Sequence, residues 1–228
     1  MGIFITGTDT GVGKTFVGCL VARLLSSRGR KVGVMKPVET GCRLKDGVVV
    51  PGDSLRLLEA SCSDIPLDMV NPYRSIHPLA PNLATRLDGE TIDPGRLKSI
   101  YEDISRRHDV VIVEGAGGLL CPLTDDMTMA DLALSLGLSL LVVAPNRLGV
   151  INHTLLTLEY ARKRGMDVKG VVLNSPEPPG DDPSRLYNRC EIERLGGARV
   201  VCEVPFSEKG DPTVVKVKSL LQAVLDLV

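Results

Sequence analysis

The sequence predicts an α/β fold: a single domain built on a doubly wound, mainly parallel sheet flanked by helices. Three observations predict it. Short apolar runs rich in β-branched residues alternate with amphipathic helical patterns along the whole chain. Most of these runs lack a strict period of two, which is typical of strands buried on both faces. The first run leads directly into a glycine-rich stretch that contains Gly-Lys-Thr and is followed by a helical pattern.

Strands and helices alternate regularly, which favours parallel strands joined by crossover helices. The expected strands are Gly2–Ile5, Val32–Met35, Val110–Val113, Leu138–Val143, Val168–Leu173 and Val200–Val204. The expected helices are Thr15–Arg28, Asp53–Ser61, Asp93–Arg107, Met129–Leu136, Ile151–Arg164, Ser184–Leu195 and Val214–Leu227. Two Pro-rich stretches, Pro66–Pro81 and Pro176–Pro183, are predicted to be loops. One domain covering residues 1–228 accounts for the chain, and ligands are expected beyond the carboxyl ends of the strands.

Charge and cysteine content exclude several classes of protein. Lys and Arg number 27 against 28 Asp and Glu, so the formal charge of −1 gives no reason to expect nucleic acid or an anionic membrane as partner. The six cysteines show no paired spacing, which indicates reduced thiols. No apolar run approaches the roughly 20 residues of a membrane span, and Met1 leaves no room for a signal peptide. We therefore expect a cytoplasmic protein.

The stretch from Thr6 to Thr15, TGTDTGVGKT, predicts a phosphate-binding loop of the P-loop NTPase type. Its glycines allow backbone amides to turn inward around phosphate oxygens, and the following helix adds the positive end of its dipole. Lys14 is expected to reach the β- and γ-phosphates, and the Thr15 hydroxyl to bind Mg²⁺. Five residues separate Gly7 from Gly13 where the usual motif has four. A purely structural turn is the alternative, but the flanking strand and helix favour an ATP or GTP site.

Lys36 follows a predicted strand, in the segment Lys36-Pro37-Val38-Glu39-Thr40-Gly41. A lysine at the carboxyl end of a strand can face the same site as the phosphate loop and stabilise charge in phosphoryl transfer. An isolated lysine is more often a solvent charge, and Thr40 could equally be a turn residue. Its position beside a triphosphate site favours the functional interpretation for Lys36.

Glu114 ends an apolar strand and precedes Gly115, Ala116 and Gly117. This resembles a Walker B strand, in which a carboxylate binds Mg²⁺ directly or through water, with Glu in place of the commoner Asp. A simple acid at a strand end is the alternative. Asp53 is a second candidate carboxylate, although its pattern alone favours an N-cap at a helix start.

The segment Leu148–His153 opens another predicted helix, whose exposed amides could hold a carboxylate. His153 could act as an acid or base, but a lone His on an amphipathic helix is more often structural. The sequence has no clustered His, Ser/His/Asp spacing or paired Cys, so a zinc hydrolase or a catalytic-triad enzyme is disfavoured.

Six segments in this order resemble the dethiobiotin synthetase family over essentially the whole chain. They are GTDTGVGKT, KPVETG, NPY at Asn71 to Tyr73, VEGAGGLL, LGVINH and VPF at Val204 to Phe206. The resemblance implies closure of the ureido ring of dethiobiotin from 7,8-diaminononanoate (7,8-diaminopelargonate), CO₂ or bicarbonate, and ATP with Mg²⁺, as a step of biotin biosynthesis. It implies a carbamate, then a carbamic-phosphoric anhydride, with release of ADP and phosphate. ATP is a co-substrate and Mg²⁺ the cofactor.

The resemblance also implies roles for individual residues. Lys14, Lys36 and Thr10 would be catalytic, and Thr15, Asp53 and Glu114 would hold the magnesium, which reverses the N-cap preference for Asp53. The nucleotide would contact Gly11, Val12, Gly13, Lys14, Thr15, Phe16, Asp53, Glu114, Gly115, Ala116, Gly117, Asn174, Ser175 and Pro205, with Asn174 reading adenine. The diamine substrate would contact Thr40, Gly149, Val150, Asn152 and Tyr187.

The same resemblance implies a homodimer in which Gly149 to Asn152 and Tyr187 cover the partner's substrate. Three positions depart from the best-known pattern: Thr40 stands where Ser is frequent, Gly11 where some members have Glu, and Asn82 where His is frequent. The Thr40 departure keeps the hydroxyl, whereas the other two alter local substrate contacts.

Two other functions are compatible with a phosphate loop. An ATP-dependent amidoligase related to the cobyrinate and cobyrate amide synthases would need a glutamine-hydrolysing domain, for which this chain is too short. A P-loop switch or partitioning ATPase normally has an extra lysine near the start of the loop, where this chain has Thr8 and Asp9. Phosphate release that depends on the diamine separates the ligase from the switch.

Overall fold

A six-stranded parallel sheet forms the centre of the molecule. The structure is a computed structural model, and it describes residues 1–178 and 180–207. The strand order is β10-β9-β8-β1-β7-β2, and all neighbours are parallel. The strands are β1 (Gly2–Gly7), β2 (Val32–Met35), β7 (Val110–Glu114), β8 (Ser139–Pro145), β9 (Val168–Asn174) and β10 (Val200–Val204). This is the predicted fold class, and all six predicted strands are present.

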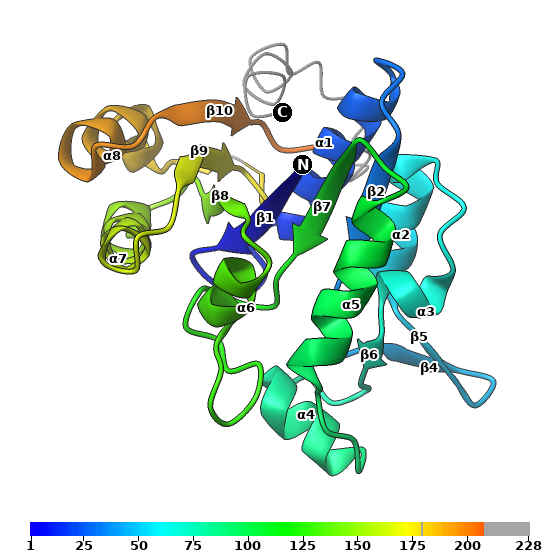
Figure 1. Cartoon of the computed structure of the whole chain (residues 1–228). Helices are drawn as coiled ribbons and strands as arrows, with labels where there is room; N and C mark the ends of the chain where they lie inside the picture. Colours follow the sequence, from blue (N-terminus) through cyan, green and yellow to red (C-terminus); the bar gives the residue numbers. More distant parts are fainter. Residues whose placement is uncertain (179, 208–228) are drawn as a thin grey trace.

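Helices connect the strands and pack on both sides of the sheet (Figure 1). They are α1 (Lys14–Ser26), α2 (Gly52–Ser61), α3 (Leu67–Val70), α4 (Pro81–Leu87), α5 (Pro94–Ser105), α6 (Met129–Ser135), α7 (Val150–Lys163) and α8 (Asn188–Gly196), with a 3₁₀ turn at Pro183–Leu186. Helix α1 packs against β1, β2, β7 and α2, whereas α5 packs against β2 and β7. In Figure 1, α5 and α6 lie in front of the sheet and α1 behind it.

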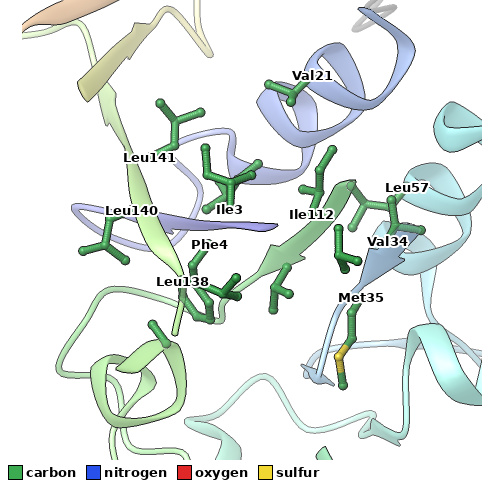
Figure 2. Packing of buried hydrophobic residues seen from close by; sticks show 14 of the residues in the cluster. Ile3, Phe4, Val21, Val34, Met35, Leu57, Ile112, Leu138, Leu140 and Leu141 are labelled. Carbon is green, nitrogen blue, oxygen red and sulfur yellow. The ribbon is translucent and has the colours of Figure 1, made fainter. Parts of the chain in front are cut away.

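The core fills both faces of the sheet. Phe4, Ile112 and Leu140 come from three neighbouring strands and are fully buried. Figure 2 shows such side chains together with Val21 from α1 and Leu57 from α2. Burying a side chain of this size stabilises the fold by about 1.5–3 kcal/mol. Burial on both faces explains why the strands lack a polar–apolar alternation.

Smaller elements also lie between β2 and α5, where the sequence predicts one helix, Asp53–Ser61, and a loop over Pro66–Pro81. The strands β3 (Val38–Glu39) and β6 (Tyr73–Arg74) pair in parallel, and β4 (Arg43–Lys45) pairs with β5 (Val48–Val50) as an antiparallel hairpin. The hairpin turns at Asp46 and Gly47, which have φ of 51° and 77°. The prediction of a loop over Pro66–Pro81 is therefore wrong in part, because it contains α3 and β6.

Helix boundaries differ from the predicted ones by a few residues. Helix α1 begins at Lys14 and ends at Ser26. The helix predicted over Ser184–Leu195 is divided into the 3₁₀ turn and α8. The helix predicted over Val214–Leu227 lies outside the described residues. Within the described residues, no helix is long and apolar enough to cross a bilayer.

Parallel strands place their carboxyl ends at one edge of the sheet. The phosphate loop follows β1, Lys36 follows β2, Glu114 ends β7 and Asn174 ends β9. The topology therefore gathers the predicted functional residues of four strands at this edge.

Candidate active site

The loop between β1 and α1 has the backbone of a phosphate-binding loop. Gly11 and Gly13 have φ of 74° and 95°, in the left-handed region that favours glycine. A Cβ on Gly13 would also lie 2.1 Å from the side-chain amide nitrogen of Asn174. No side chain caps the start of α1, so its first amides are available to an anion.

Lys14 folds back over this loop. Its Nζ donates a hydrogen bond to the carbonyl oxygen of Asp9 at 2.9 Å. Burial and, second, the positive charge of Lys36 lower the pKa of Lys14 from 10.5 to about 8. An anionic ligand in the loop would favour the charged form of this lysine.

A buried cluster of Lys36, Glu114 and Thr15 lies beside the phosphate loop. The Lys36 Nζ forms an ion pair with Glu114 Oε1 and also donates to the carbonyl oxygen of Gly115 at 3.3 Å. The Thr15 hydroxyl donates to the same Glu114 oxygen at 2.8 Å. Burial alone lowers the pKa of Lys36, but the charges of Glu114 and then Asp53 outweigh it and raise that pKa. Lys36 is therefore a charged lysine in the site.

The second carboxylate oxygen of Glu114, Oε2, is buried and has no hydrogen-bond partner among the described residues. A buried polar atom without a partner costs free energy, so such an atom calls for an explanation. The carboxylate of Asp53, half-buried in the first turn of α2, likewise makes no hydrogen bond or ion pair to any described residue. The two carboxylates can therefore accept a further ligand.

Asp53 does not cap the helix, contrary to the pattern-based preference. The N-cap of α2 is Pro51, and Asp53 lies one residue inside the helix. Proline offers no side-chain acceptor, so the amides at this helix start need another partner.

A cavity of about 710 Å³ joins these groups. Twelve of the predicted residues line it: Thr10, Gly11, Gly13, Lys14, Thr15, Phe16, Lys36, Thr40, Asp53, Glu114, Ala116 and Gly117. Its other walls come from residues that the sequence did not single out for this site: Val38, Glu39, Arg56, Pro78, Leu79, Ala80, Pro81 and Cys121. The sequence indicates Pro78–Pro81 only as the end of the Pro-rich stretch that is predicted to be a loop.

Asn82, one of the departing positions, does not line the cavity. It lies on α4, and its side-chain amide donates to Asp125 Oδ1 at 3.0 Å, where Arg86 also binds. This contact joins α4 to the loop between β7 and α6.

Asn174 and its neighbours lie on the other side of the phosphate loop. The Asn174 amide donates to the carbonyl oxygen of Val12 at 2.9 Å, and its side chain is almost fully buried. The Ser175 amide donates to the carbonyl oxygen of Val204, and exposed Pro205 follows. The ends of β9 and β10 therefore meet here, but Asn174, Ser175 and Pro205 do not line the cavity, and their contact with adenine stays a prediction.

Gly149, Val150, Asn152 and Tyr187 do not line the main cavity. Gly149 and Val150 lie at the start of α7, Asn152 is exposed, and Tyr187 is 64% exposed. Within a single chain, the structure does not bring these predicted substrate contacts to the phosphate loop.

Relatives of known name cover most of the chain. Residues 1–213 match a protein family described as an AAA domain. A protein of Anaeromyxobacter sp. (strain K) named ATP-dependent dethiobiotin synthetase BioD is 45% identical over 205 residues, which are 90% of each chain. A protein of the same name from Methanocaldococcus jannaschii is 44% identical over 176 residues, 75% of this chain and 78% of that one. The chain belongs to the dethiobiotin synthetase family. It is an ATP-dependent ligase of biotin biosynthesis.

Solved structures support the fold of this dethiobiotin synthetase family member. A chain of the MinC:MinD cell division protein complex of Aquifex aeolicus has a TM-score of 0.61 at 15% identity, covering 99% of this chain and 95% of that one. The Pyrococcus furiosus cell division ATPase MinD has a TM-score of 0.57 at 20% identity, covering both chains fully. At these identities the likeness concerns the P-loop ATPase fold alone. The two relatives named dethiobiotin synthetase match this chain at more than twice the identity of these solved structures. The assignment to the ligase family therefore decides against the P-loop switch and the amidoligase.

Proposed function

We propose that the protein closes the ureido ring of dethiobiotin from 7,8-diaminononanoate, CO₂ and ATP. The observation that carries this proposal is the buried cluster of Lys36, Glu114 and Thr15 beside the phosphate loop. A switch ATPase needs only the phosphate loop and a magnesium site. A further buried lysine in the same cavity as the loop suits the attack of an anionic substrate on phosphorus.

The reaction balances in three steps. One amine of the diamine adds to CO₂, loses a proton and becomes a carbamate. A carbamate oxygen then attacks the γ-phosphorus of ATP, which breaks the bond to ADP and forms a carbamic-phosphoric anhydride. The second amine attacks the carbonyl carbon, loses a proton and expels phosphate, and this closes the ring.

The residues of the cavity suit these charges. Lys14 and Lys36 would stabilise the negative charge that moves from the carbamate to the transferring phosphoryl group and to ADP. The hydroxyls of Thr10 and Thr40, which line the same cavity, would orient the carbamate and the diamine. Burial of Lys36 and Glu114 at 4% and 1% exposure strengthens these interactions because water does not screen them.

Magnesium fits the donors that are present. The unpartnered Glu114 Oε2, the Asp53 carboxylate and the Thr15 hydroxyl offer oxygen atoms, which Mg²⁺ prefers. No cluster of three His, Cys, Asp or Glu side chains exists within residues 1–178 and 180–207, so phosphate oxygens and water would complete the shell. When bound, the ion would neutralise phosphate charge and align the γ-phosphoryl group.

The nucleotide and the dimer complete the proposal. Gly11 to Phe16 and Gly115 to Gly117 would surround the phosphates, and Asn174, Ser175 and Pro205 would bind adenine.

A homodimer would bring Gly149, Val150, Asn152 and Tyr187 of one subunit to the other subunit's diamine. Exposed apolar side chains near the start of α7 support this interface, with Leu148 80% and Leu186 79% exposed. We also propose that residues 1–228 form one cytoplasmic domain.

Phosphate release tests the proposal. We would measure it with Mg²⁺ and ATP, with and without 7,8-diaminononanoate and bicarbonate. The proposal predicts release that requires the diamine. Equal release without the diamine would instead indicate a nucleoside triphosphatase that does not use this substrate.

A further inference from the structure

Helix α2, which carries Asp53, begins without a local cap. Its N-cap residue is Pro51, whose side chain has no acceptor, and Gly52 follows. The first amides of a helix have no partner within the helix, and a side chain usually supplies one. At α2 the acceptor must come from elsewhere in the chain.

Glu39 supplies it from β3. Its Oε1 accepts a hydrogen bond from the Asp53 amide at 2.9 Å. Its Oε2 accepts from the Ser54 amide at 2.9 Å and from the Ser54 hydroxyl at 2.5 Å. Glu39 is 6% exposed and Ser54 is fully buried, so these bonds are formed out of water. A carboxylate at a helix start also interacts favourably with the helix dipole.

Glu39 is itself held in place. Its carbonyl oxygen accepts from the Ser75 amide at 2.9 Å, and β3 pairs with β6. Three residues before it, Lys36 is fixed by the ion pair to Glu114. One short segment therefore carries both the buried lysine and the cap of α2.

The Asp53 carboxylate depends on this arrangement. It makes no hydrogen bond or ion pair to another side chain in the described part of the molecule. Only the longer-range attraction of Lys36 and Lys14 and the position of its own backbone determine where it lies in the cavity. That backbone is held by Glu39 through the Asp53 amide. We propose that Glu39 is a positioning residue that holds the Asp53 carboxylate at the magnesium and phosphate end of the cavity. This inference rests on the role of Asp53 in the proposed function.

The test measures the affinity for ADP by calorimetry, with and without Mg²⁺. The ratio of the two affinities is called the magnesium gain. In the wild type we expect Mg²⁺ to tighten the binding of ADP. Substitution of residues that orient metal ligands costs about 10–100-fold in metal affinity, so E39A should reduce this gain by about tenfold or more. E39Q keeps one acceptor oxygen and should show a smaller loss.

A matched control separates positioning from stability. Asp93 caps α5 outside the cavity by accepting from the Gly95 amide at 2.8 Å. D93A should lower the unfolding temperature as a cap loss does, yet leave the magnesium gain unchanged. If E39A lowers the unfolding temperature but keeps the full magnesium gain, Glu39 is only a helix cap and the inference fails.

A double-mutant cycle tests whether Glu39 acts through Asp53. If it does, E39A should cause no further loss of the magnesium gain in a D53N background. Additive losses would contradict the inference. If E39A does not fold, E39Q replaces it in the cycle. A wild-type protein without any magnesium gain would count against the proposed function itself, which distinguishes the two failures.

Discussion

Lys36 and Glu114 form an ion pair whose side chains are 5% and 1% exposed, although 78 positions separate them in the sequence. The pair joins the end of β2 to the end of β7 across one edge of the sheet. Taking two charges out of water is costly, and only their mutual attraction and further hydrogen bonds offset that cost. The same ion pair therefore contributes to the stability of the fold and to the geometry of the active site.

Removal of the Glu114 charge should destabilise the fold. E114Q leaves Lys36 buried without its counter-ion, and breaking a buried pair in this way costs about 3–5 kcal/mol. Urea unfolding of both proteins measures the difference in free energy. The control is D125N, which breaks the exposed pair of Asp125 with Arg86 and should cost about 1 kcal/mol or less. Equal losses in the two variants would contradict the prediction.

Lys36 should matter for the chemical step more than for nucleotide binding. Loss of one group that stabilises transition-state charge costs about 10²–10³-fold in kcat, so we expect this loss of diamine-dependent phosphate release in K36M. The affinity for ADP should change much less. The control, K45M, removes an exposed lysine of the β4–β5 hairpin and should keep full activity. An active K36M would remove Lys36 from the catalytic residues.

The two left-handed glycines of the phosphate loop should differ in their tolerance to alanine. G11A faces open space, so it should cost only the backbone strain of about 1–2 kcal/mol. In G13A the new Cβ would also meet Asn174 at 2.1 Å, next to the bond from Asn174 to Val12. We expect G13A to abolish ADP binding and G11A to retain part of it. Calorimetric titration with ADP compares them, and equal affinities would contradict the close approach.

The stabilising effect of Asp131 should depend on pH. Hydrogen bonds from Thr128 and, second, from Arg164 lower the pKa of Asp131 from 3.8 to about 2. Since the folded state favours the ionised form, this contribution is present above about pH 4 and is lost as the pH falls through about 2. D131N should therefore be less stable than the wild type by about 1–2 kcal/mol at pH 7, and the difference should vanish near pH 2. If the difference in stability between D131N and the wild type stayed constant from pH 7 to about pH 2, the charge of Asp131 would be excluded as its origin.

The sequence predicts the central sheet well because its signals are local. The bounds of β2 and β10 agree with the prediction. β2 is a short apolar run between Lys31 and Lys36, and β10 is rich in valine and ends before Pro205. The glycines and Gly-Lys-Thr of the phosphate loop predict a turn that the structure confirms, because positive φ is a property of single residues. That one domain spans all 228 residues stays a prediction.

The remaining errors have physical reasons. The Asp46-Gly47 pair is a hairpin signal, but the flanking strands are so short that periodicity did not reveal them. Glu39 lies in the segment KPVETG, but nothing in that segment indicates a role for it. Its three hydrogen bonds reach residues 14 and 15 positions away, which only the folded chain brings close. The local pattern favours an N-cap at Asp53 because the sequence does not show that α2 begins at Gly52, after Pro51.

Isotope incorporation tests the central claim most directly. The enzyme would be supplied with Mg²⁺, ATP, 7,8-diaminononanoate and ¹³C-labelled bicarbonate, and the products analysed by mass spectrometry. The proposed function predicts a product with the mass of dethiobiotin that contains one labelled carbon, with one ADP formed per product. ATP hydrolysis at the same rate without the diamine, and no labelled product, would contradict it.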